Sequence, residues 1–376
     1  MKQLTIISLS NLKKDPRVKR QINYLKSFYT IRCVGFSDPE IDEVEFIDVS
    51  IPFNKLKLAF SYLNLLVGRY KQFYWKQKEI QSALKQLKDL QSDLFIANDI
   101  DVLPLCLELS KSNAAKIIFD AHEFSPLEHN DSFLWRLLFK KYKTNLIKKY
   151  ASKANLMLTV CDGIAEKYTA DFGLHPIVIT NASDYVEISI KHATSDKIRL
   201  IHHGIAMPTR KIENMIEMMD FVDDRFELDL MLVHSKSNYY NKLNTLAKNR
   251  KNVNFISPVA SDDIIKFTSN YDLGIYILEP TNLNNHFALP NKLFEFIQAR
   301  LAIAIGPSPE MSKIVKENDL GIVAVDFNPK TMADALNLLK HNDINQFKEN
   351  SANAAKRLNS EVNMQLLKKE IDQLIS

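Results

Sequence analysis

Glycine is scarce in this sequence of 376 residues. Only eight glycines occur, about 2% of the chain, where roughly 7% is usual. No two of them stand close enough to write the G-x-G-x-x-G fingerprint, the Walker phosphate loop or the G-x-S-x-G elbow. These absences exclude the common glycine-built nucleotide sites, so a bound nucleotide has to be held in another way.

Cysteine and long apolar runs are scarce as well. The three cysteines, Cys33, Cys106 and Cys161, are widely spaced, which excludes a C-x-x-C metal site and argues against a disulfide scaffold. No run of about 18 apolar residues occurs, and the apolar run near the start is too short for a signal peptide. We therefore expect a protein of the reducing cytoplasm that can meet a membrane only by lying on it.

The net charge is small. Lys and Arg total 49 and Asp and Glu total 45, so the chain carries +4, too little over this length to indicate a nucleic-acid binder. Hydrophobic residues make up 46%, which predicts a packed core, and the length favours two domains.

Short apolar runs alternate with longer helical patterns. Buried runs separated by helices are typical of parallel strands in βαβ units. A first series lies at 4–10, 31–36, 93–97, 116–121 and 155–160, and a second at 197–203, 228–233, 253–256, 271–278, 301–306 and 320–325. Residues 180–196, between the series, are polar, and we place a domain boundary there. The end of the chain is helical by pattern, with one apolar face.

Polar residues follow the first series of strands. Pro16 can open a helix after the first strand, which would leave Lys14, Asp15 and Arg17 at the open end of that strand. A capped helix with solvated charges is an equally good interpretation. Two later strands bring a larger set of polar side chains to the same edge: Asn98, Asp99, Asp101, Asp120, His122 and Glu123.

That larger set predicts a working site, because so many carboxylates would be costly in a core. Asp99 and Asp101 also spell D-x-D, a pattern that holds a divalent metal in some glycosyltransferases. Asp101 could instead cap the following helix.

Two basic residues in the second half are predicted to converge on an anion. Pro290 can start a helix that carries Lys292 in its first turn and Glu295 one turn later, and a helix N-terminus favours phosphate. Arg210 lies in a loop before another helix and could neutralise a diphosphate from the other side. An amphipathic helix with two surface charges is the alternative. We interpret His202, His203 and His234 as structural residues.

Two stretches are basic and aromatic without acidic residues. Residues 132–153 and 55–78 combine lysines with aromatic and leucine side chains, a pattern used by helices at an anionic membrane surface. The alternative is that these helices bury their aromatic residues in the first domain.

Several motifs in order resemble a known family. The series DPRVKR, ANDIDVLP, DAHE, LTVCDGIAEKY, VITNASD and ALPNKLFEFIQARLAIAI resembles bacterial retaining glycosyltransferases of the GT-B fold, family 4. The resemblance implies a Rossmann-like acceptor domain at 1–185, a Rossmann-like nucleotide-sugar domain at 186–360 and a helix at 361–376 that crosses back. It implies a retaining transfer from a nucleotide sugar, most simply a UDP-sugar, to a glycan or lipid-linked acceptor of surface polysaccharide synthesis.

The resemblance also assigns roles. Catalytic positions would be His122, Asp99 and Glu123; donor-binding positions Gly204, Arg210, Asn291, Lys292, Leu293 and Glu295; acceptor-binding positions Lys14, Asp15, Arg17 and Asn98. No metal or other cofactor is implied as obligatory.

The sequence departs from the family pattern at two positions. The E-x7-E motif requires a carboxylate eight residues before Glu295, where this chain has Phe287, and His234 replaces a glycine. These departures leave two alternatives open: a catalytically weak GT-B protein that binds a nucleotide or a partner, and a sugar-nucleotide epimerase.

Overall fold

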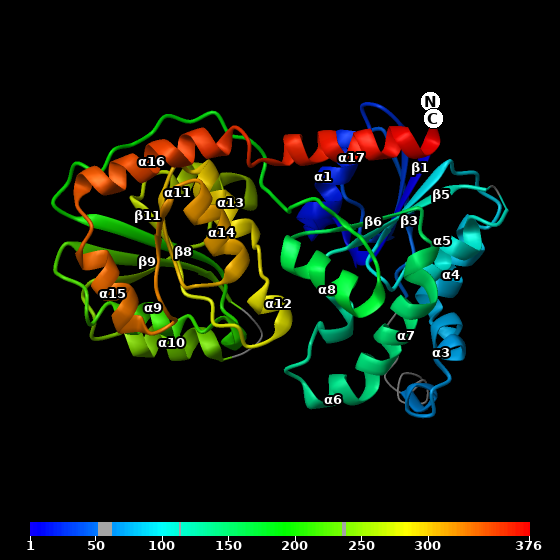
Figure 1. Ribbon diagram of the computed structural model, residues 1–376, viewed down its shortest axis with the longest axis horizontal. Helices are drawn as coiled ribbons and strands as arrows, with labels where there is room; N and C mark the ends of the chain where they lie inside the picture. Colours follow the sequence, from blue (N-terminus) through cyan, green and yellow to red (C-terminus); the bar gives the residue numbers. More distant parts are fainter. Residues whose placement is uncertain (52–61, 113, 235–237) are drawn as a thin grey trace. The chain divides into compact units, whose positions relative to one another are not determined.

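The chain folds into two compact units. The computed structural model describes residues 1–51, 62–112, 114–234 and 238–376. Unit 1 comprises Met1–Thr180, Asn282–Asn284 and Asn363–Ser376, and unit 2 comprises Asn181–Thr281 and Asn285–Val362. Each unit is built around one parallel sheet (Figure 1).

In the described part of unit 1, seven strands form the sheet in the order β3-β2-β1-β4-β5-β6-β7. The strands are β1 (Gln3–Asn11), β2 (Thr30–Phe36), β3 (Val44–Asp48), β4 (Leu94–Asn98), β5 (Lys116–Ala121), β6 (Leu156–Thr159) and β7 (Ile177–Val178). The helices are α1 (Pro16–Leu25), α3 (Tyr70–Lys76), α4 (Lys78–Leu87), α5 (Leu103–Leu109), α6 (Phe133–Trp135), α7 (Lys141–Tyr150) and α8 (Asp162–Phe172), with a π-helix, η3 (Arg136–Lys140), between α6 and α7.

In unit 2 the described strands number six and follow the order β10-β9-β8-β11-β12-β13. They are β8 (Ile198–Ile205), β9 (Phe226–Val233), β10 (Val253–Ile256), β11 (Leu273–Tyr276), β12 (Ala302–Ile305) and β13 (Gly321–Val323). The helices between Asn181 and Val362 are α9 (Glu213–Met218), α10 (Tyr239–Ala247), α11 (Ile264–Thr268), α12 (Leu283–His286), α13 (Asn291–Gln298), α14 (Pro309–Glu317), α15 (Pro329–Asn337) and α16 (His341–Ala355).

Both sheets have the doubly wound Rossmann order. Counted from its own first strand, unit 1 runs 3-2-1-4-5-6-7 and unit 2 runs 3-2-1-4-5-6. The direction of winding therefore reverses between β1 and β4 in unit 1 and between β8 and β11 in unit 2. Ligands of such sheets bind outside the carboxyl ends of the strands at this reversal. The topology therefore directs attention to the residues that follow β1, β4, β8 and β11.

The predicted strands are confirmed. All eleven predicted apolar runs form strands, because central strands such as β4 and β12 are buried on both faces and consist of apolar residues almost throughout. Strands β3 and β7 were not predicted from the sequence. Both lie at the edges of their sheet, where partial exposure weakens the apolar pattern, and β7 has only two residues.

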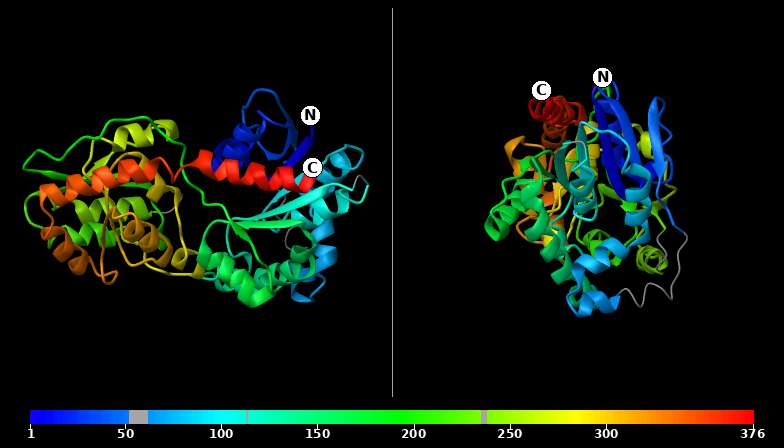
Figure 2. Two further views of the ribbon diagram at one scale, coloured as in Figure 1. Left: turned by 45° about the horizontal axis from the view of Figure 1, so that its top comes forward. Right: turned by 90° about the vertical axis from the view of Figure 1, so that its right-hand side faces the viewer.

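The last helix, α17 (Ser360–Ile375), packs on unit 1, as predicted. Met364, Leu367 and Ile371 of α17 join the same hydrophobic cluster as Val18 and Ile22 of α1. The two chain ends consequently lie side by side on unit 1 (Figure 2). None of the helices in the described ranges is long and apolar enough to cross a membrane.

Candidate functional site

Two basic side chains meet beside Gly204, near the carboxyl end of β8. Gly204 has φ 135°, and a Cβ placed on it would lie 3.5 Å from both Arg210 Nη1 and Lys292 Nζ. Arg210 ends a short 3₁₀ turn, Pro208–Arg210, whereas Lys292 comes from the first turn of α13, which begins directly after Pro290. Both cations therefore approach the point that a side chain at position 204 would occupy.

Lys292 is buried and held by neutral groups. Only 5% of it is exposed. Its Nζ lies 3.0 Å from His202 Nε2 and 3.8 Å from the centroid of the Tyr276 ring. His202 Nδ1 lies 3.0 Å from the carbonyl oxygen of Ile275, so Nδ1 carries the proton and Nε2 is free to accept from Lys292.

The electrostatics of this cluster favour an incoming anion. Burial, reinforced by the charge of Arg210, holds the pKa of Lys292 well below its usual range. Burial and the nearby Lys292 and Arg210 lower the pKa of His203 to about 3. An anion placed between Arg210 and Lys292 would relieve this repulsion, so the electrostatics of the cluster suit a bound anion.

The other predicted donor residues surround the two cations. Glu295, on the next turn of α13, has Oε2 3.4 Å from His203 Nε2 and a side chain that is 20% exposed. Asn291 is the half-buried first residue of α13. Leu293 is 1% exposed and packs into the core of unit 2, so it holds α13 in place.

In unit 1, a hydrogen-bonded network occupies the carboxyl ends of β4 and β5. The fully buried Asp120 accepts two hydrogen bonds from Arg17, at 2.6 and 2.9 Å, and one from Gln21 at 2.6 Å. Burial alone would raise the pKa of Asp120, but the Arg17 guanidinium holds it well below its usual range. Gln21 Oε1 in turn accepts a hydrogen bond from Asn98 at 3.3 Å.

His122 completes this network at the rim. Its Nε2 lies 3.1 Å from Asn98 Oδ1, and its Nδ1 lies 3.5 Å from Asp99 Oδ2. Burial works against the charged form, but the carboxylates of Asp99 and Asp120 outweigh it and raise the pKa of His122 to about 9. Asp99 has φ 68°, a strained conformation for a residue other than glycine, and this turns its carboxylate back toward His122. His122 is therefore an imidazolium at neutral pH.

The remaining predicted residues of unit 1 have different surroundings. Lys14 is exposed, and Asp15 caps α1 by accepting a hydrogen bond from Val18 N at 3.2 Å. Arg17, which we expected at the open end of the first strand, is instead buried and engaged by Asp120. Glu123 is exposed, and its backbone carbonyl accepts a hydrogen bond from Tyr168.

Asp101, the second carboxylate of the D-x-D pattern, is held by a cation of the protein. Its Oδ2 lies 2.5 Å from Lys143 Nζ, and Glu128 Oε2 lies 3.3 Å from the same nitrogen. The cap of α5 is Val102 rather than Asp101. Within the described ranges, no group of three or more His, Cys, Asp or Glu side chains is placed to hold a metal ion.

Several residues that support the two clusters were not predicted as part of them, although His202 was interpreted as structural. His202 and Tyr276 hold Lys292, and Gln21 links Asp120 to Asn98. A signal existed for His202 and Tyr276, since each lies near the carboxyl end of a buried strand next to the reversal of winding. Gln21 had none, because its position in the middle of α1 resembles that of any polar helix residue.

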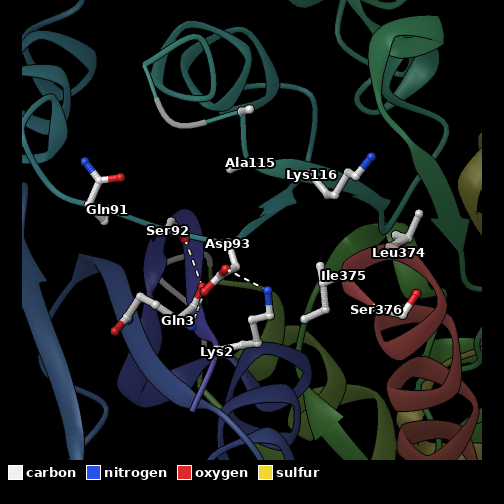
Figure 3. A pocket seen from close by; sticks show the side chains of 11 residues that line it. Lys2, Gln3, Gln91, Ser92, Asp93, Ala115, Lys116, Leu374, Ile375 and Ser376 are labelled. Atoms are coloured by element: carbon white, nitrogen blue, oxygen red, sulfur yellow. Dashed lines mark hydrogen bonds and ion pairs between the residues drawn. The ribbon is translucent and has the colours of Figure 1, made fainter.

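A cavity of about 310 Å³ lies at the opposite, amino edge of the unit 1 sheet (Figure 3). Lys2, Asp93 and Lys116 line it together with the last residues of α17. The carboxylate of Asp93 accepts hydrogen bonds there from Gln3 N at 2.8 Å and from Lys2 Nζ at 3.2 Å. The cavity is therefore separate from the residues at the carboxyl ends of the strands.

Comparison with known proteins identifies the fold. No family model matches the sequence, and no curated protein matches it. Solved structures do match along the whole chain. TarM of S. aureus, in a complex with Fondaparinux, alpha-GlcNAc-glycerol and UDP, has a TM-score of 0.73 and 12% identity, covering 100% of both chains.

Two further solved structures have a similar fold. HepE of Anabaena, in complex with UDP, has a TM-score of 0.69 and 14% identity, covering 99% of this chain and 100% of that one. Sucrose-phosphate synthase of Thermosynechococcus elongatus has a TM-score of 0.72 and 11% identity, covering 100% and 99%. The two Rossmann-like units with a returning last helix thus define a GT-B fold. The predicted fold class is confirmed.

Proposed function

We propose that this protein is a glycosyltransferase that moves a sugar from a nucleoside diphosphate donor. The observation that carries the proposal is the pair of cations, Arg210 and Lys292, that converge beside Gly204. A buried lysine next to an arginine is unfavourable by itself and becomes favourable when a diphosphate lies between them. The GT-B fold supports the same interpretation.

Departure of the nucleoside diphosphate leaves an oxocarbenium-like sugar and places negative charge on the leaving group. Arg210, Lys292 and the N-terminus of α13 would stabilise that charge, with Gly204 and Asn291 allowing its close approach. We propose that Glu295 accepts hydrogen bonds from the ribose of the nucleoside. The acceptor hydroxyl would attack on the face from which the diphosphate leaves, with the phosphate as base, which gives retention.

Unit 1 would supply the acceptor side. We assign His122 and Asp99 to positioning the reacting sugar, with Glu123 beside them, and Lys14, Asp15 and Asn98 to the acceptor. Arg17 would act through Asp120 by holding the network in place. We assign no metal to the reaction.

A UDP-sugar is the donor we favour, because UDP is the nucleotide named for the TarM and HepE structures. A glycan or lipid-linked acceptor of bacterial surface polysaccharide or capsule synthesis is the proposed second substrate. The reaction would then take place at the inner face of the cell membrane.

Phe287 supports a second candidate. It stands where the family places the carboxylate that touches the donor sugar, so the protein could bind a nucleotide or a partner transferase with little turnover of its own.

The proposal is tested by incubating the protein with UDP-, GDP- and dTDP-sugars, membrane lipid extract as acceptor, and EDTA. Release of nucleoside diphosphate from one donor is expected. Arg210→Ala should lower the rate roughly 10²- to 10³-fold, because it removes one stabiliser of the leaving group. Glu295→Ala should weaken donor binding.

Lys356→Ala, at an exposed cation of the same unit, is the matched control and should leave the rate unchanged. Full turnover by Arg210→Ala would disprove the assigned site. Nucleotide binding without release across the panel would favour the weak, partner-dependent candidate.

A further inference from the structure

Six of the large apolar side chains exposed on the protein gather on two segments of unit 1. They belong to residues 62–78 and 132–153, which we call the basic-apolar surface; residues 55–61 of the stretch predicted from sequence lie outside the described residues. The exposed fractions run from 53% to 71%, for Leu63, Leu66, Val67, Phe133, Leu134 and Leu137. Scattered single apolar residues need no explanation, but a set confined to two segments does.

The two segments form one surface because their inward-facing aromatic residues pack together. The Tyr62 ring lies 5.7 Å from that of Phe139, and Phe73 lies 6.5 Å from Phe139 and 5.0 Å from Tyr142. Leu138, Tyr142, Leu146 and Ile147 are buried beneath them. The alternative considered for these aromatic residues is thus correct for the inner side, whereas the outer side keeps its apolar residues exposed. In Figure 1, α7 lies next to α3 in unit 1.

The same surface concentrates the positive charge of the protein. Residues 62–78 contain four Lys or Arg and residues 132–153 contain seven, with no acidic residue in either. The whole chain carries +4, so everything outside these two segments sums to −7. Of the eleven basic residues, Lys143 is buried against Asp101, and the others are exposed.

The composition of this charge decides between two classes of partner. Eight of the ten exposed cations are lysines, which are strongly hydrated point charges, whereas protein interfaces are enriched in arginine and depleted in lysine. A diffuse field of lysines around exposed leucine and phenylalanine matches a bilayer with anionic headgroups, where each cation contributes roughly 1 kcal/mol and apolar residues enter the acyl boundary.

The aromatic residues of the basic-apolar surface also match a bilayer. Both tryptophans of the chain, Trp75 and Trp135, lie in these segments and are half-buried. Lys149 and Lys153 lie over the Tyr150 ring, at 5.3 and 5.5 Å from its centroid. Amphipathic rings of this kind are enriched where lipid meets water.

We propose that residues 62–78 and 132–153 bind the surface of a membrane that contains anionic lipid, with Phe133, Leu134, Leu137, Leu63, Leu66 and Val67 inserted and the lysines on the headgroups. This inference depends only on unit 1 and does not require the proposed transfer activity.

Vesicle binding tests the inference with the full chain. Sedimentation with vesicles of phosphatidylcholine alone is compared with sedimentation with equimolar phosphatidylcholine and phosphatidylglycerol. Binding is expected on the anionic vesicles only, and it should fall steeply as the Debye length shrinks from about 10 Å at 0.1 M salt to about 3 Å at 1 M. The emission of Trp75 and Trp135 should shift to shorter wavelength on binding.

Variants separate the two parts of the surface. Lys140→Glu with Lys141→Glu should weaken binding more than tenfold, given roughly 1 kcal/mol for each charge. Phe133→Ser with Leu134→Ser should abolish the fluorescence shift. The matched controls lie in unit 2: Lys242→Glu with Lys248→Glu for charge, and Leu338→Ser, at a residue 80% exposed, for apolar area.

All substituted residues are exposed, so folding should be preserved, as circular dichroism can verify. Equal binding of the native protein to both kinds of vesicle, or no binding to the anionic ones at 0.1 M salt, overturns the inference. An equal loss in the control variants does the same. Binding of UDP measured without lipid reports on the donor site separately.

Discussion

Burial and the like charge of Arg210 oppose the charge of Lys292. His202, His203 and the Tyr276 ring around it are neutral, and Glu295 on its own helix is the acid that partly offsets the effect. The pKa of Lys292 is lowered in the free protein, first by burial and then by Arg210. A bound diphosphate would raise that pKa again, since opposite charge favours the protonated amine.

We therefore predict that UDP binding takes up a proton at pH values between the lowered pKa of Lys292 in the free protein and the ordinary pKa of a lysine. Isothermal titration in buffers of different ionisation enthalpy measures this uptake. Lys292→Arg is the control, because its guanidinium stays charged whether or not the ligand is present, so binding should persist without uptake. The prediction is wrong if UDP binds the native protein without proton uptake at every pH between neutral and the ordinary pKa of lysine. Lys292 would then already be charged in the free protein.

The pKa of His122 is shifted in the opposite direction to that of Lys292, and this shift predicts a pH dependence of stability. The pKa of His122 is about 9 in the folded protein and about 6.5 when unfolded, so the folded form holds the proton more tightly. The stabilisation by the imidazolium is complete below about pH 6.5, and is lost as pH rises through about 9. The difference in melting temperature between native protein and His122→Gln should shrink over that interval.

Differential scanning at a series of pH values measures this difference, and NMR titration of the ring gives the pKa directly. His129→Gln, at an exposed histidine of the same unit, is the matched control. A difference that grows with pH would mean that His122 is neutral in the folded state.

At the residue scale, the sequence could predict side chains that follow a strand or begin a helix. Lys292, Arg210 and His122 were found in this way, since chain position alone carries such residues to the carboxyl ends of strands. The burial of Arg17 could not be predicted. Whether a helix residue faces a substrate or an interior carboxylate depends on Asp120, which lies 103 residues away along the chain.

At the element scale, the same local signals predicted where helices begin. Pro16 and Pro290 mark the starts of α1 and α13, because proline costs no hydrogen bond in the first turn. The edge strands β3 and β7 were missed because they are half-exposed. Helix α17 was predicted from its apolar face, which needs a partner surface to be stable.

That partner surface supports a stability prediction. Ile371 and Leu367 of α17 are fully buried in the cluster with α1. Ile371→Ala should lower the free energy of unfolding of unit 1 by about 2–5 kcal/mol, since it removes buried methyl groups and leaves a cavity. Denaturant unfolding measures the change, and Gln373→Ala, at an exposed residue on the same helix, should be nearly neutral. A neutral Ile371→Ala would mean that α17 contributes little to unit 1.

At the scale of the whole molecule, the chain divides between Thr180 and Asn181 and returns to unit 1 at Asn363. Both units repeat one strand order, so each has its own reversal of winding and its own set of polar residues there. Unit 1 gathers carboxylates around an imidazolium, whereas unit 2 gathers cations around a glycine. In the proposed transfer, the cations of unit 2 would stabilise the leaving diphosphate, and the polar residues of unit 1 would position the acceptor and the reacting sugar.

The sequence by itself determined the central strands, the helix starts and the helical character of the last segment, because these follow from apolar periodicity and from the backbone limits of proline and glycine, which act over a few residues. The return of the last helix to unit 1 was implied only by the family resemblance. Only the tertiary structure decided which polar residues are buried partners and which are open to a ligand. Arg17 and Lys292 are both basic residues in the first turn of a helix. One is neutralised by Asp120 across the sheet, and the other is left beside Arg210, since the charge that surrounds a side chain depends on distant segments that folding brings together.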